Sequence, residues 1–72
     1  MVKQRDLVKR IAGMAKTADA VWVLHSQGGR HEVWLLNGRK IEIPRHREIN
    51  ELTAKGIIHT AQNVIDGKDT GR

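Results

Sequence analysis

His31 and the cations near it are the residues in this sequence best suited to chemistry. His31 follows Gly28-Gly29-Arg30, a short and flexible run. An imidazole titrates near neutral pH, so it can give or take a proton under physiological conditions. RNA carries its own nucleophile, the 2′-hydroxyl, and its cleavage needs a base, an acid and cations near the phosphorus. A histidine among cations is the minimum set of groups for that reaction, but spacing alone favours a surface histidine without a catalytic role.

The surroundings of the other three histidines give less support for a chemical role. His46 lies between Arg45 and Arg47, where it is a candidate phosphate contact, a candidate second proton carrier, or a polar loop residue. We expect His25 and His59 to be structural or solvent-exposed.

A metal or cofactor site is not expected. The chain has no cysteine, and its four histidines and eight acidic residues contain no HxxxH or HExxH spacing. The Gly28-Gly29 pair has no phosphate-loop pattern around it, so we assign these glycines to a loop.

A β-hairpin should position His31. Asn37-Gly38 is typical of a type I′ turn, which needs positive φ at both central residues. A two-residue loop pairs Trp34 with Ile41 and Leu36 with Arg39, and it places Trp34, Leu36, Ile41 and Ile43 on one face. His31, Val33, Leu35, Lys40 and Glu42 then share the opposite, more open face. A bulge in the first arm would exchange the two faces.

Two amphipathic helices and a further strand flank this hairpin. Leu7, Ile11 and Met14 recur at helical spacing within residues 3–16, and a second apolar stripe runs from Ala54 to Val64. The second helix has Asn50 or Thr53 as its N-cap and Gly67 as its stop signal. Residues 20–25 are typical of a strand that is buried on both sides or lies at the edge of the core, and residues 44–49 of a polar connector.

The resulting order predicts a two-layer α+β fold, α-β-β-β-α, with both helices on one face of a three-stranded antiparallel sheet. This is the layout of double-stranded-RNA-binding-like folds. We expect one domain over residues 1–66 and a flexible tail over residues 67–72. No membrane span or signal peptide is visible, so we expect a cytoplasmic protein without membrane contact.

The charge distribution favours a polyanionic partner. The net charge is +5, with five basic residues and one acid in residues 1–16, and five basic residues and two acids in residues 28–47. A basic surface formed by the first helix and the hairpin suits nucleic acid, although a solvated basic face has the same composition. With only two tryptophans as aromatic residues, RNA would be bound through phosphates and shape rather than by stacking.

The sequence resembles the HicA family, the toxins of certain toxin–antitoxin systems. These toxins are small ribonucleases that cleave mRNA. The resemblance covers residues 3–66. It rests on four motifs in order, namely Arg5-Asp6-Leu7-Val8-Lys9, Gly29-Arg30-His31, Ile41-Glu42-Ile43-Pro44-Arg45-His46 and Thr53-Ala54-Lys55-Gly56-Ile57-Ile58. It implies metal-independent mRNA cleavage by His31 and a HicB-type antitoxin that covers this histidine. Arg30 replaces the Ser or Asn usual before the histidine, and Gly56 stands where a helix former is usual.

Two hypotheses follow. In the first, the chain is an endoribonuclease toxin, monomeric on its own, with His31 as general acid or base. In the second, it is a non-catalytic RNA-binding or protein-interaction module, served by the same charge and by an exposed patch at Val33 and Leu35. The candidate RNA contacts are Arg30, Lys40, Arg45, His46, Arg47 and Lys55, and the candidate loop residues are Gly28 and Gly29.

Overall fold

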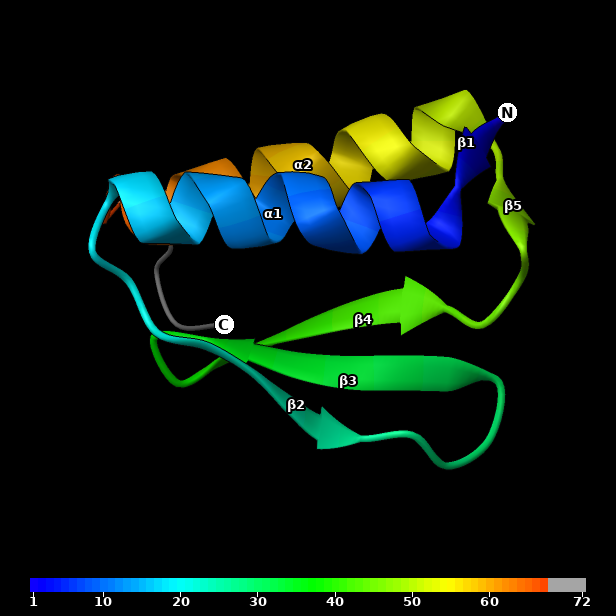
Figure 1. The fold of residues 1–72 in the computed structure, drawn as a ribbon, viewed down its shortest axis with the longest axis horizontal. Helices are drawn as coiled ribbons and strands as arrows, with labels where there is room; N and C mark the ends of the chain where they lie inside the picture. Colours follow the sequence, from blue (N-terminus) through cyan, green and yellow to red (C-terminus); the bar gives the residue numbers. More distant parts are fainter. Residues whose placement is uncertain (68–72) are drawn as a thin grey trace.

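Two helices lie side by side on one face of a three-stranded antiparallel sheet (Figure 1). The computed structural model describes residues 1–67, so most of the predicted tail, residues 68–72, lies outside the described residues. The larger sheet has the order β2-β3-β4, and the predicted α-β-β-β-α arrangement is confirmed. The elements are β1 (Val2–Lys3), α1 (Gln4–Thr17), β2 (Trp22–Ser26), β3 (His31–Leu36), β4 (Arg39–Pro44), β5 (Glu48–Ile49) and α2 (Glu51–Ile65).

The β3–β4 hairpin has the predicted turn and register. Asn37 and Gly38 have φ values of 52° and 83°, the left-handed conformation that a type I′ turn requires at both positions. Leu36 pairs with Arg39, Trp34 with Ile41, and the ladder continues without a shift to His31 and Pro44. The two faces of the hairpin are therefore those that the turn predicts.

Strand β2 is an edge strand of the sheet, and its exposure decides between its two predicted positions. Trp22 is partly buried and the other four residues are exposed, so the strand lies at the edge of the core. Asn37 holds its start, because its backbone N–H donates to the Val21 carbonyl at 2.8 Å and its Oδ1 accepts from the Val21 N–H at 2.9 Å. The strand begins at Trp22, two residues later than expected. Its register with β3 shifts between Leu24 and Ser26, so the irregularity lies in β2 and the hairpin stays regular.

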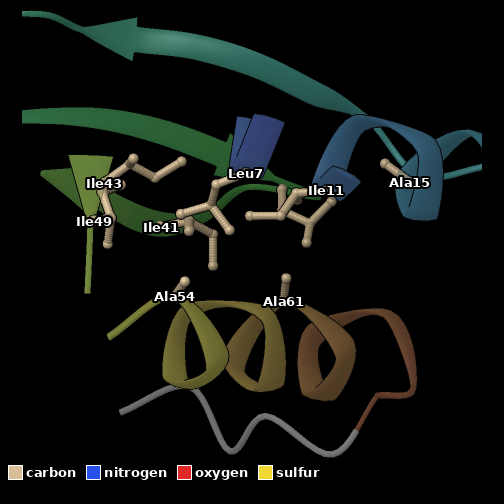
Figure 2. Close-up of a cluster of buried hydrophobic side chains, with 9 residues drawn as sticks. Leu7, Ile11, Ala15, Ile41, Ile43, Ile49, Ala54 and Ala61 are labelled. Carbon is tan, nitrogen blue, oxygen red and sulfur yellow. The ribbon is translucent and has the colours of Figure 1, made fainter. Parts of the chain in front are cut away.

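The core lies between the helices and the inner face of the hairpin (Figure 2). Helix α1 contributes Leu7, Ile11 and Ala15, while α2 presents Ala54 and Ala61. The small alanine side chains on α2 face the larger aliphatic side chains of α1 and the sheet. The remaining buried members of this core are Leu36, Ile41, Ile43 and Ile49.

The ends of α2 follow local capping rules. Asn50 is the N-cap, and its Oδ1 accepts from the Leu52 N–H at 2.8 Å, which excludes Thr53 from that role. Gly67 follows the C-cap Asp66 with a φ of 74°, as expected for a glycine stop signal. No helix within residues 1–67 has the length and apolar character needed to cross a membrane.

The prediction of a plain connector over residues 44–49 was wrong. Glu48–Ile49 forms β5, which pairs antiparallel with β1, with Val2 opposite Ile49 and Lys3 opposite Glu48. Ile49 is 3% exposed and belongs to the core. This two-residue ladder joins the start of α1 to the segment that follows β4, and it therefore shapes the end of the molecule where His31 lies.

Ile43→Ala should destabilise the fold because Ile43 is fully buried in the middle of the core. We expect the free energy of unfolding to fall by about 2–5 kcal/mol, as measured by urea denaturation. Val23→Ala is the control, since Val23 is 46% exposed on the edge strand, and it should change stability by about 0.5 kcal/mol or less. Equal losses in the two variants would contradict this assignment of the core.

Candidate nucleic-acid interface

His31 is an exposed side chain at the start of β3, on the sheet face that the helices do not cover. It pairs with Pro44, and the alternation along β3 puts it with Val33 and Leu35, opposite the buried Leu36. Val33 and Leu35 are half-buried, so the patch expected there is less exposed than predicted. A ligand can therefore reach the His31 ring from solvent without any movement of the helices.

The loop before His31 is fastened by Arg45. The Arg45 backbone N–H donates to the Arg30 carbonyl at 3.0 Å, one step beyond the end of the β3–β4 ladder. Its guanidinium Nη1 also donates to the carbonyls of Gln27, at 2.7 Å, and Gly29, at 3.4 Å. Gly29 has a φ of 73°, a conformation that favours glycine. Arg45 thus has a structural role in addition to the phosphate contact predicted for it.

A basic pocket opens at the same end of the sheet, beside the start of α1. Its volume is about 400 Å³. The pairing of β1 with β5 and a hydrogen bond from the Gln4 N–H to the Arg47 carbonyl, at 3.0 Å, bring its segments together. We call it the α1 pocket, and its lining residues are Lys3, Gln4, Arg5, Glu32, Arg45, His46 and Arg47.

Four of these lining residues were not among the predicted site residues. Lys3 and Arg5 are typical of a solvated helix face, and the β1–β5 pairing together with the Gln4–Arg47 backbone hydrogen bond brings them beside the 45–47 segment. Gln4 and Glu32 carry no motif of their own. The alternation of the hairpin was the available signal for Glu32, since it places this residue on the face opposite its neighbour His31.

Glu32 is held in place by two neutral donors. Its Oε1 accepts from the Gln4 side-chain amide at 2.8 Å and from the Trp34 indole N–H at 3.0 Å. The Trp34 ring in turn stacks on Trp22, with ring centroids 4.7 Å apart and planes 8° from parallel. The Trp22 indole nitrogen is buried and has no hydrogen-bond partner among residues 1–67. The hydrogen bonds of Glu32 and the stacked rings connect the α1 pocket to strands β2 and β3.

The structure gathers only part of the predicted set. Arg30, His31 and the 45–47 segment lie at one end of the hairpin. Lys40 shares the open face, but it pairs with Leu35, four residues or about 13 Å along the strands from His31. Lys55 is exposed on α2, which packs on the other face of the sheet.

The described part of the chain contains no group of three or more His, Asp or Glu residues placed to hold a metal ion. The chemistry that the site can offer from its own side chains is proton transfer at His31 and electrostatic attraction of anions by the arginines and lysines.

Comparisons of the chain with protein-family models, with curated proteins and with solved structures find no match.

Arg45→Ala should loosen the loop before His31, because it removes the side-chain hydrogen bonds to Gln27 and Gly29. We expect the backbone NMR order parameters of residues 28–30 to fall toward about 0.6. Arg47→Ala is the matched control: it removes the same charge from the same segment, but the Arg47 side chain fastens nothing within residues 1–67. Unchanged order parameters in Arg45→Ala would show that the loop is held by other contacts.

Proposed function

We propose that this chain is an endoribonuclease toxin of the HicA type, which cleaves mRNA with His31 as its catalytic residue. The observation that carries the proposal is the exposure of the His31 side chain on the open sheet face, beside Arg30 and the basic 45–47 segment. The reaction class is what the resemblance of the four motifs to that family implies. A ring buried under the helices would have left the same sequence without a usable site.

The proposed reaction uses the nucleophile that RNA already carries. A base removes the proton of the 2′-hydroxyl, the 2′-oxygen bonds to phosphorus, and the bond from phosphorus to the 5′-oxygen breaks. An acid then gives a proton to the departing 5′-oxygen. His31 performs one of these two transfers, and His46 or solvent performs the other. Arg30 stabilises the extra negative charge on the phosphorane oxygens.

The proposal includes a protein partner. An antitoxin of the HicB type would neutralise the toxin by covering His31 and excluding RNA from the open face. This face offers such a partner half-buried Val33 and Leu35, and Val23, 46% exposed, pairs with Leu35 on the neighbouring strand. We propose a monomeric toxin in the cytoplasm, without a cofactor or membrane contact.

The second candidate is a non-catalytic module that binds RNA or another protein. The apolar side chains on the open face favour it, since reaction chemistry does not require them. This module would bind RNA in a salt-sensitive manner without cleaving it. An antitoxin-like reading frame beside the gene would favour the toxin.

His31→Ala should lower RNA cleavage by about 100-fold or more, because it removes a proton-transfer group. His59→Ala is the matched control, since His59 is exposed on α2, away from the open face, and it should retain wild-type cleavage. Cleavage of purified mRNA and growth arrest on expression would be measured together, with circular dichroism to verify folding. Undiminished cleavage by a folded His31→Ala variant would remove the assignment.

A further inference from the structure

We propose that the α1 pocket binds a backbone phosphate of the RNA strand, separate from the phosphate that is cleaved at His31. This inference rests on the proposed function for its ligand. It assigns a binding role to Lys3 and Arg5, at the start of α1, and it extends the RNA path from the open face of the sheet around its end to the helix side.

The cations of the α1 pocket are not neutralised by the protein. Lys3, Arg5 and Arg47 are exposed, and within residues 1–67 their side chains make no ion pair or hydrogen bond. Among the described residues, Glu32 is the only carboxylate in the lining, and it is engaged by the neutral donors Gln4 and Trp34 instead. Three exposed cations without a partner, Lys3, Arg5 and Arg47, therefore line the pocket and are available to an anion, whereas the Arg45 guanidinium is engaged with the carbonyls of the loop before His31.

The location of the pocket connects it to His31. Glu32 follows His31 directly in β3, and the strand alternation sends the two side chains to opposite faces at the same end of the sheet. Arg45 likewise follows Pro44, the residue paired with His31. An RNA strand that lies over His31 and turns around this end of the sheet therefore passes into the α1 pocket.

The chemistry of the lining favours phosphate over a base. Neither tryptophan lines the pocket, and the Trp34 ring and its indole N–H are already engaged with Trp22 and Glu32. Without an aromatic platform the pocket offers no stacking, whereas lysine and arginine bind phosphates regardless of sequence. Holding a second phosphate of the same strand raises the effective concentration of the first at His31. The pocket should therefore contribute affinity rather than sequence preference.

The test compares two charge-matched double variants in binding to a single-stranded RNA with 2′-O-methyl groups at every ribose, which this reaction cannot cleave. Lys3→Gln/Arg5→Gln removes two cations from the pocket. Lys9→Gln/Lys16→Gln removes two exposed cations elsewhere on α1. Removing cations from the first turn of a helix does not disfavour it, so the pocket variant should fold.

We expect the pocket variant to bind about tenfold or more weakly at low salt. The slope of log affinity against log salt concentration should become shallower by about 1.4, or about 0.7 for each lost phosphate contact on a single strand. The control variant should change the slope little. Equal loss in both variants would overturn the inference, as would tight binding of inorganic phosphate alone, which would indicate a site for a free anion.

The outcomes separate this inference from the proposed function. If wild-type protein binds RNA through the pocket but cleaves nothing, the toxin proposal fails and the pocket stands. If wild-type protein cleaves RNA and both double variants bind alike, the pocket inference fails and the toxin proposal stands. An absence of RNA binding by the wild-type protein would overturn both.

Discussion

The positive φ values of Asn37 and Gly38 are the constraint on which the site depends. They produce a two-residue turn, and such a turn permits one register between β3 and β4. A slip of one residue would exchange the faces of the hairpin, burying His31 near the helices and exposing Leu36 to solvent. The hydrophobic core opposes the same slip, because Leu36 and Ile43 are fully buried in the observed register. Turn geometry and core packing therefore select the same face for the histidine.

The hydrophobic core and the polar residues of the candidate site occupy different parts of the two-layer fold. The helices and the inner face of the hairpin contain the buried apolar side chains. The outer face of the hairpin is therefore not part of the hydrophobic core. Polar residues gather where the layers meet at one end, because β1 and β5 tie the start of α1 to the segment after β4. Arg45 holds the loop before His31 there, while the Lys3 and Arg5 side chains make no hydrogen bond or ion pair within residues 1–67. Part of this basic end thus maintains the fold, and part is available to a ligand.

Local patterns predicted most of the fold and only part of the site. The Asn37-Gly38 turn determines its own strand pairing, and the helical stripes that contain Leu7 and Ala54 identify the buried faces. The β1–β5 ladder has no local signal, because two residues at each of two distant positions cannot show an alternation. The α1 pocket depends on that ladder, so Lys3 and Arg5 could not be assigned to it from sequence. Lys55 was predicted to contact RNA with the other cations, but α2 places it in the helical layer.

The end groups of the RNA fragments give the most direct test of His31-dependent cleavage through the 2′-hydroxyl. Purified protein would be incubated with RNA in the presence of a metal chelator, and the new termini would be identified by mass spectrometry. The account predicts cleavage that the chelator does not affect, with a 2′,3′-cyclic phosphate on one fragment and a 5′-hydroxyl on the other. Fragments with a 3′-hydroxyl and a 5′-phosphate, or cleavage that stops when metal is removed, would contradict it.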